Sequence, residues 1–348
     1  MTGSPTSTIT IGVLALQGAF AEHITLLRQA ADDLHRFQIV ERDDWRSQSA
    51  HADGHADADG DAADANADSG DRRASGSHPI KINSSCASSS TKNGDVTLPL
   101  DSDFDSDFDF DLIEVRTPAS LARCDGLIIP GGESTSISLI ASRTGLLEPL
   151  REFVKVQRRP TWGTCAGLIL LAESANKSKA SGQELIGGLD VRVQRNYFGR
   201  QVESFEADLL LPALLGEEGD VFHTVFIRAP VVEAVLTPDS FVGDGDGEGE
   251  GEVPLAAPTT DDAVVVAPAK QATKAPVEIL GRLPGRAKTI RDQTTNAADL
   301  GEDGDIVAVK QGNVFGTAFH PELTGDGRIH AWWLREVVKA VRERQMGP

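Results

Sequence analysis

The sequence has few cysteines and no long apolar run, and both shortages narrow the class of protein. Its three cysteines, Cys86, Cys124 and Cys165, are an odd and sparse set, so a disulfide framework is excluded and we expect a reducing compartment. No apolar stretch reaches the ~20 residues that cross a membrane, and residues 1–5 lack the pattern of a secretory signal. We therefore expect a soluble, cytoplasmic protein with no membrane partner.

Basic residues are also scarce: 33 Lys and Arg stand against 53 Asp and Glu, for a formal net charge of −20. The excess is concentrated in two segments. Residues 43–111 hold 16 Asp, no Glu and five basic residues, and residues 238–262 hold eight acidic residues and no basic one. The rest of the chain is close to neutral, so the acidity says little about a substrate. No basic stripe is present, which argues against a nucleic-acid partner.

Three segments lack the apolar periodicity of packed elements, and we interpret them as insertions in one domain that spans residues 8–346. Residues 43–111 are rich in Ala, Asp, Gly and Ser, residues 239–275 combine an acidic Gly/Glu tract with Ala, Pro and Thr, and residues 286–304 read as a loop. The first two bury too little apolar surface to offset their ordering entropy, so we predict that they are disordered. We expect the first to leave after a second strand near Arg42 and to rejoin at Leu112.

The other segments alternate between strand-like and helix-like patterns. We expect strands at residues 9–16, 112–115, 125–130, 160–164, 189–194, 202–210, 223–228, 277–280, 306–310 and 314–319. We expect helices at residues 19–34, 134–158, 166–172 and 328–344. Early alternation predicts an α/β fold, a single three-layer domain with a mostly parallel central sheet flanked by helices. Ligands of such sheets bind at the carboxyl ends of the strands.

One cysteine lies where a predicted strand turns into a helix. The apolar segment ends at Thr164, Cys165 follows, and Gly167 opens a helical run. The sulfur would project beside the first helix amides, which favour a thiolate and bind an oxyanion. Far downstream, His320 and Glu322 are two residues apart and point the same way in extended backbone. Together they predict a nucleophile, its base and the group that orients the base.

Each of these residues also has a structural interpretation. Cys165 alone could be a small core residue, as we expect for Cys124, but Gly167 and the downstream His-Pro-Glu favour catalysis. Gly132 could belong to a plain strand-end turn, although a Gly peptide can also rotate its N–H toward an oxyanion. We favour an oxyanion hole formed by the N–H groups of Gly132 and Ala166. His51 and His55 are too loosely spaced in a low-complexity tract to indicate a metal site.

Six sequence blocks resemble a known family. They are Val13-Leu14-Ala15-Leu16-Gln17-Gly18-Ala19-Phe20-Ala21-Glu22-His23, Ile129-Pro130-Gly131-Gly132-Glu133-Ser134-Thr135, Trp162-Gly163-Thr164-Cys165-Ala166-Gly167, Gln194-Arg195-Asn196-Tyr197-Phe198-Gly199-Arg200-Gln201-Val202-Glu203-Ser204-Phe205, Phe226-Ile227-Arg228-Ala229-Pro230 and Phe319-His320-Pro321-Glu322-Leu323-Thr324. The chain resembles the class I glutamine amidotransferases and, more closely, the glutaminase subunits of pyridoxal 5′-phosphate synthase. Its long acidic insertions resemble those of fungal members.

The resemblance implies hydrolysis of L-glutamine to L-glutamate and ammonia, with the ammonia passed to the lyase subunit of the synthase. It implies no cofactor and no metal. By resemblance, the catalytic residues are Cys165, His320 and Glu322, and the residues that bind glutamine are Gly132, Glu133, Ser134, Arg195, Ile227 and Arg228. Residues 17–23 are the expected docking edge for the partner.

Several alternatives stay open at this point. Glu133 and Ser134 could instead cap the helix that follows them, and Arg195 and Arg228 could form surface ion pairs. Tyr197 stands where the family more often has a smaller residue, so we expect it to reshape the pocket rim. The function could also be that of another class I glutaminase, a γ-glutamyl hydrolase or a non-catalytic scaffold subunit.

Overall fold

The computed structural model describes residues 7–52, 108–176, 183–195, 197, 204–216, 221–236, 264–268, 275–283 and 304–347. The chain divides into two compact units. One comprises Met1–Arg36 and Leu98–Pro348, and the other is Phe37–Thr97. In the second unit the structure describes the end of helix α1 (Phe20–Ala52), which remains helical to Ala52.

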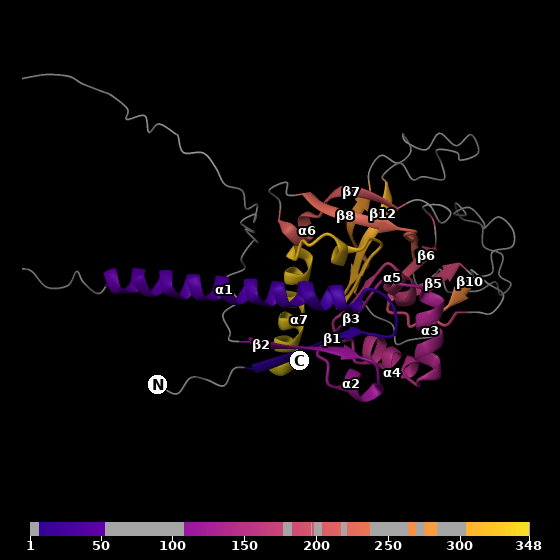
Figure 1. Cartoon of the computed structure of the whole chain (residues 1–348), viewed down its shortest axis with the longest axis horizontal. Helices are drawn as coiled ribbons and strands as arrows, with labels where there is room; N and C mark the ends of the chain where they lie inside the picture. The colour runs from indigo at the N-terminus through magenta and orange to yellow at the C-terminus, as the bar shows by residue number, and fades with distance from the viewer. Residues whose placement is uncertain are drawn as a thin grey trace, which may run out of the picture. The chain divides into compact units, whose positions relative to one another are not determined.

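Eleven strands of this unit form one mixed sheet in the order β10-β5-β6-β9-β12-β13-β4-β3-β1-β2, with β11 also paired to β12 (Figure 1). The strands are β1 (Ser7–Leu14), β2 (Phe108–Val115), β3 (Gly126–Ile129), β4 (Thr161–Thr164), β5 (Ala172–Asn176), β6 (Leu189–Gln194), β9 (Val231–Val235), β10 (Val264–Val266), β11 (Glu278–Leu283), β12 (Asp305–Gln311) and β13 (Val314–Thr317). Strands β2, β1, β3, β4 and β13 are adjacent in that order and run parallel to one another, and β13 is antiparallel to β12. From β12 outward the pairing is antiparallel except between β5 and β6. A separate hairpin pairs β7 (Ser204–Leu210) with β8 (Val221–Ile227).

Helices cover both faces of the parallel half. The described helices besides α1 are α2 (Pro118–Ala122), α3 (Ser134–Arg143), α4 (Leu147–Arg151), the π-helix η1 (Glu152–Val156), α5 (Ala166–Leu171), α6 (Pro212–Leu215), the 3₁₀ turn η5 (Pro321–Leu323) and α7 (Arg328–Met346). On one face, Gly126 lies so close to Trp333 and Val337 of α7 that a Cβ there would be 2.9 Å from Val337. On the other face, Gly163 lies against α5, where a Cβ would be 2.5 Å from the Gly167 backbone. The predicted α/β fold with helices flanking a large central sheet is confirmed.

The predicted edges of the first insertion are wrong. Helix α1 continues to Ala52, and the second strand of the sheet follows the insertion, because β2 begins at Phe108 and not at Leu112. Residues 35–53 contain neither Gly nor Pro and include good helix formers, so nothing stops the helix near Arg42. In β2 the Phe residues alternate with Asp, a period-two strand pattern that the acidic composition obscured. The rest of the tract, residues 53–107, lies outside the described residues, and its disorder stays a prediction.

Two further sequence predictions differ in detail. Within predicted insertion 239–275, the β-branched run Val264–Val266 forms strand β10 and pairs antiparallel with β5. The single helix predicted at residues 134–158 is instead α3, α4 and η1, because Gly145 takes a φ of +70° after the end of α3. Residues 237–263 and 284–303 lie outside the described residues.

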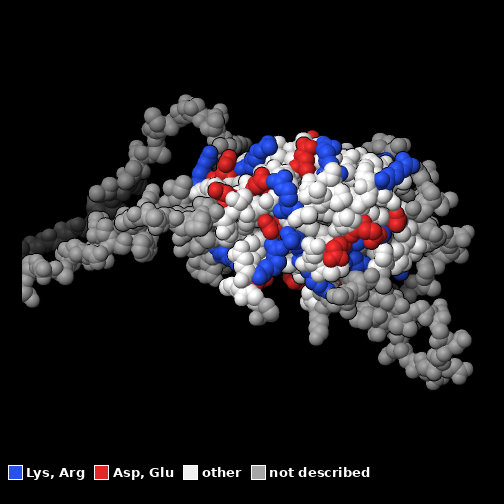
Figure 2. Space-filling view, turned by 90° about the horizontal axis from the view of Figure 1, so that it is seen from below, with Lys and Arg blue, Asp and Glu red and all other residues white. Residues whose placement is uncertain are grey.

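The surface of the described residues is mixed in charge. On the face that Figure 2 shows, Lys and Arg are interspersed with Asp and Glu, and neither sign forms a broad field. In the part of the chain that the structure covers, no helix combines the length and the apolar character needed to cross a bilayer.

We predict that two deletions differing by four residues behave differently. Replacing residues 43–107 with a short Gly/Ser linker should leave the melting temperature nearly unchanged. Extending the deletion to residue 111 should lower the free energy of unfolding by at least ~3 kcal/mol, because it removes half of β2. That half pairs with β1 and carries the buried Phe108, whose carbonyl contacts His35 Nε2 at 2.8 Å. Thermal unfolding of the two variants measures the difference, and equal melting temperatures would contradict the prediction.

Candidate active site

Cys165 lies at a strained turn between β4 and α5. Its φ of 48° and ψ of −98° are rare for a residue with a side chain, and its N–H donates to Thr317 O at 2.8 Å. The turn is tight because α5 packs directly on the sheet: a Cβ on Gly167 would be 2.0 Å from Ile129 O. The thiol is therefore fixed at the carboxyl end of β4, as the sequence predicted, and it is 6% exposed.

His320 and Glu322 form a buried pair beside this cysteine. His320 follows β13, and its backbone N–H donates to Val225 O of β8 at 2.8 Å. Its Nδ1 lies 2.7 Å from Glu322 Oε1, and the Glu322 side chain is fully buried. A carboxylate on Nδ1 fixes the ring so that Nε2 is left for the thiol.

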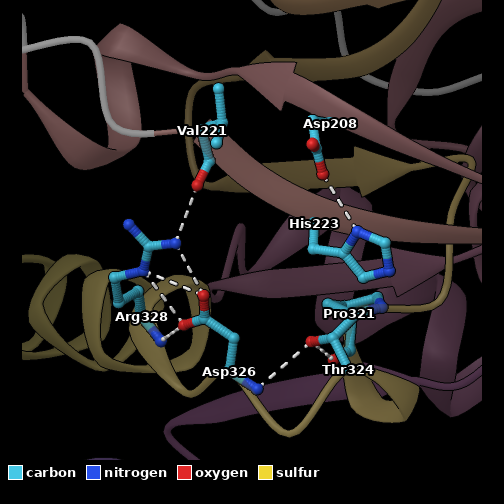
Figure 3. Close-up of polar contacts among 7 residues, drawn as sticks. All are labelled: Asp208, Val221, His223, Pro321, Thr324, Asp326 and Arg328. Atoms are coloured by element: carbon cyan, nitrogen blue, oxygen red, sulfur yellow. Dashed lines mark hydrogen bonds and ion pairs between the residues drawn. The ribbon is translucent and has the colours of Figure 1, made fainter. Parts of the chain in front are cut away.

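The segment after Glu322 is held by its own polar network (Figure 3). Thr324 Oγ1 donates to Pro321 O at 2.9 Å and accepts the Asp326 N–H at 3.2 Å. Arg328, at the start of α7, binds the Asp326 carboxylate at 2.7 Å and donates to Val221 O of β8 at 2.9 Å. The turn that carries His320 and Glu322 is therefore fastened to both α7 and β8.

The pKa of His320 reflects these neighbours. Burial is the largest single influence and lowers it, but hydrogen bonds to Cys165 and Glu322, with their charges, raise the pKa to about 10. His320 is thus an imidazolium at neutral pH, paired with the thiol on one side and the carboxylate on the other. Gly131 packs against this ring, where a Cβ would be 2.3 Å from His320 Cε1.

The Gly131-Gly132 loop is tied to the beginning of α1. Gly131 O accepts the Ala19 N–H at 3.3 Å, and the Glu133 N–H donates to Gln17 Oε1 at 2.7 Å. The approach is so close that a Cβ on Gly18, whose φ is +101°, would be 1.8 Å from Gly131 O. Any movement of residues 17–19 therefore acts on the peptide between Gly131 and Gly132.

A second polar cluster lies around Gln183. Its Oε1 accepts from Ser134 Oγ at 3.1 Å, from Thr135 Oγ1 at 3.2 Å and from Arg195 Nη1 at 2.5 Å. Gln183, Ser134 and Arg195 are all buried. The structure thus brings Ser134 and Arg195 together, and Arg195 is a buried residue, not a surface ion pair.

Glu133 lies at the edge of this cluster and caps α3. Its carboxylate accepts from Thr135 N at 3.0 Å and Ser136 N at 2.7 Å, which is the structural alternative the sequence left open. Burial acts to raise the pKa of Glu133, but these hydrogen bonds outweigh it and hold the pKa below its ordinary value. Its charge also acts on Arg195. Burial lowers the pKa of Arg195, and the negative charge of Glu133 partly offsets this lowering.

Of the remaining predicted residues, Ala166 and Ile227 lie beside Cys165. Ala166 is the first residue of α5, and Ile227 O at the end of β8 lies 4.0 Å from Cys165 Sγ. Arg228 follows with a φ of 44° and is exposed, and Tyr197 is half-buried. The structure records no contact that joins Arg228 to the Gln183 cluster, so its role stays a prediction.

The structure describes only some of the other cysteine and histidine residues that the sequence analysis considered. Burial raises the pKa of Cys124 to about 12, which suits an unreactive core thiol. Cys86 and His55 lie outside the described residues, as does the side chain of His51. Among the residues that the structure describes, no cluster of His, Cys, Asp and Glu could hold a metal ion.

Three residues near the site had no individual role in the sequence analysis: His23, Thr164 and Gln183. His23 entered it only as the last residue of the predicted docking edge, and the structure buries it completely. His23 lies on the apolar face of α1 with Leu27, and this position is the one signal that marked it as buried. Thr164 Oγ1 accepts the Gly131 N–H at 2.9 Å. Gln183 precedes β6 in a segment without periodicity, so no sequence pattern singled it out.

A family model and two curated relatives agree on one family. A model of the SNO glutamine amidotransferase family matches residues 94–265 and 278–339, which include the Cys-His-Glu set. The probable pyridoxal 5′-phosphate synthase subunit PDX2 of Arabidopsis thaliana is 42% identical over 225 residues, which is 64% of this chain and 75% of that protein. The pyridoxal 5′-phosphate synthase subunit PdxT of Streptomyces avermitilis is 40% identical over 229 residues, which is 66% of this chain and 83% of that protein. A solved glutamine amidotransferase structure aligns with a TM-score of 0.49 at 27% identity, over 94% of this chain and 98% of that one.

We predict that Cys165→Ala lowers the pKa of His320 from about 10, because it removes the hydrogen bond and the charge of Cys165. NMR of a chain labelled in its imidazole rings, recorded against pH, measures the midpoint. His223 is the internal control, because its raised pKa depends chiefly on a hydrogen bond to Asp208. An unchanged His320 midpoint would refute the pairing.

The same shift predicts a dependence of stability on pH. The folded-state pKa of His320 lies above its unfolded value of 6.5, so its contribution is complete below pH 6.5 and is lost as the pH rises through about 10. Denaturant unfolding from pH 6 to 10 should show a steeper loss for wild type than for Cys165→Ala.

Proposed function

The chain belongs to the SNO glutamine amidotransferase family, and on this basis we propose that it hydrolyses L-glutamine to L-glutamate and ammonia as the glutaminase subunit of a pyridoxal 5′-phosphate synthase. One geometric observation carries the proposal. The Cys165 thiol is held at a strained strand–helix turn, and Gly131 packs against both Cys165 and His320. His320 Nδ1 in turn is 2.7 Å from Glu322 Oε1. This arrangement provides a nucleophile, an acid–base group and its orienting carboxylate.

In the proposed reaction, the Cys165 thiolate attacks the side-chain amide carbon of glutamine. The C–N bond of the tetrahedral intermediate breaks as the His320 imidazolium gives its proton to the departing ammonia. The neutral imidazole then takes a proton from water, which attacks the thioester carbonyl and releases glutamate and the thiolate. Glu322 keeps the ring oriented and stabilises its charged form in both halves. In each half, the N–H groups of Gly132 and Ala166 hold the oxyanion.

The polar cluster around Gln183 supports a proposal for glutamine binding. Arg195, with Ser134 beside it, suits the α-carboxylate of an amino acid. The exposed face of the Glu133 carboxylate suits the α-ammonium, while its other contacts cap α3. The Ile227 carbonyl approaches Cys165 Sγ and Arg228 comes directly after it, so these two residues would line the pocket between the ammonium site and the thiol.

For the ammonia acceptor we propose the lyase subunit of the synthase, docked on the accessible part of the predicted edge, residues 17–22, since His23 is buried. The support is the coupling of this segment to the Gly131-Gly132 loop through Gln17 and Ala19. A partner that shifts residues 17–19 would reorient the peptide whose N–H belongs to the proposed oxyanion hole.

We predict that Cys165→Ala abolishes glutamine hydrolysis and that Glu322→Gln lowers kcat by roughly 10²–10⁴-fold. The amide keeps the size of the carboxylate but loses the charge that supports the imidazolium. Ammonia release in the presence of the synthase partner measures both, with partner binding and melting temperature as controls for folding. Substantial glutaminase activity in Cys165→Ala would show that Cys165 is not the nucleophile. Wild-type turnover in Glu322→Gln would show that Glu322 has only a structural role.

We also predict that the isolated chain is a poor glutaminase that its partner activates. Glu22→Lys should weaken partner binding and stimulation together, because Glu22 is exposed within the proposed docking segment. Arg28→Glu is the matched control, an exposed charge reversal further along α1. Co-purification and ammonia release, with and without partner, test this. Full glutaminase activity without the partner would contradict the predicted activation. Equal effects of Glu22→Lys and Arg28→Glu on partner binding would contradict the proposed docking segment.

A further inference from the structure

Behind the catalytic set lies a buried histidine that the mechanism does not use. His23, on α1, is 0% exposed. Its Nδ1 is 3.0 Å from Nε2 of the equally buried His330 on α7. Its Nε2 is 3.3 Å from Thr164 Oγ1 and also 3.3 Å from Glu322 Oε2. One imidazole therefore faces both the residue before Cys165 and the carboxylate behind His320.

Electrostatics decide which nitrogen of His23 carries the proton. Burial, with the charges of His330 and His320, holds the pKa of His23 well below its ordinary value, so the ring is neutral with one N–H. A lone pair on Nε2 would face a carboxylate oxygen, whereas an N–H there donates toward Glu322 and Thr164. Nδ1 then accepts from His330 Nε2–H. This leaves His330 Nδ1 as a lone pair, and that atom has no hydrogen-bond partner among the described residues.

Glu322 needs such a donor. Its Oε1 is engaged by His320, but Oε2 is buried and makes no well-formed hydrogen bond within the described part of the chain. A buried carboxylate oxygen without a donor is costly and free to rotate away from its partner. We propose that His23 is a positioning residue for Glu322, whose Nε2–H holds the carboxylate oxygen that does not contact His320.

The same N–H connects two parts of the machinery. Thr164 Oγ1, its other neighbour, accepts the N–H of Gly131, which precedes the proposed oxyanion peptide. His23 thus stands between the orienter of the base and the loop that follows β3. As a positioning role in the reaction, this inference rests on the proposed function, although the contact itself does not.

Three substitutions at His23 separate a positioning role from a packing role. In His23→Gln the amide nitrogen reaches about as far as Nε2 and keeps the donor. In His23→Asn the same amide reaches only as far as Nδ1, and in His23→Leu the donor is absent. Loss of a comparable outer hydrogen bond costs about 10–100-fold in metalloenzymes, and we expect a fall of the same order in kcat for Asn and Leu. His23→Gln should stay within a few-fold of wild type.

The kinetics are measured on the full chain with its synthase partner, and KM should change little in all three variants. The acid limb of kcat/KM should move to higher pH in Asn and Leu but not in Gln, because a carboxylate without its donor is protonated more readily. Leu27→Ala is the control for lost packing, since Leu27 is buried one turn further along α1. It should lower the melting temperature without moving the pH profile.

A measurement without substrate keeps this inference separate from the proposed function. The His320 midpoint, followed by NMR, should fall in His23→Asn and His23→Leu and stay near wild type in His23→Gln. Equal His320 midpoints and equal kcat in His23→Gln and His23→Asn would overturn the positioning role. A shift of the pH profile of kcat/KM in Leu27→Ala would also overturn it. If wild type with partner releases no ammonia, the proposed function fails, and the NMR result alone decides the role of His23.

Discussion

A single buried carboxylate organises the centre of this molecule. The Glu322 side chain is fully buried, and its charge is tolerable because imidazoles face both of its oxygens. One of these, His320, is held as a cation by the thiol and the carboxylate together. The other, His23, is kept neutral by burial. The positions of β4, η5, α1 and α7 must all agree for these rings to meet at one carboxylate.

The elements around that carboxylate were predictable where local chemistry alone determines them. The strand, tight turn and helix at Cys165 follow from small residues after an apolar strand. The pairing of His320 with Glu322 was predicted from their two-residue spacing, but the backbone there is the 3₁₀ turn η5 and not the extended chain that the prediction assumed. The α/β class follows from the alternation of strand and helix patterns. Each prediction depends on a few residues that are adjacent in sequence, so no tertiary information was needed.

What could not be predicted depends on contacts between distant segments. Gln183 gathers Ser134 and Arg195 only because three segments that are separate in the sequence meet at one point, and nothing in its own neighbourhood marks it. The edges of the first insertion were misplaced because composition was weighed above pattern. The Asp residues of β2 conceal alternating Phe side chains, one of which is buried against the core. The grouping of Cys165, His320 and Glu322 could be predicted from sequence, whereas the residues that surround them could not.

Strand β10 has a consequence for how the chain accommodates its second long insertion. Val264–Val266 pairs with β5, and just beyond it Lys155, itself paired with Glu173, donates to Pro268 O. On the other side, β9 is fixed between β6 and β12, and the Leu236 N–H donates to Asp190 O at 2.8 Å. The segment between them therefore starts and ends at two anchored points of the same sheet. On the prediction that this segment is disordered, its length can change during evolution at an entropic cost of about 0.6 kcal/mol per doubling, without any adjustment at the thiol.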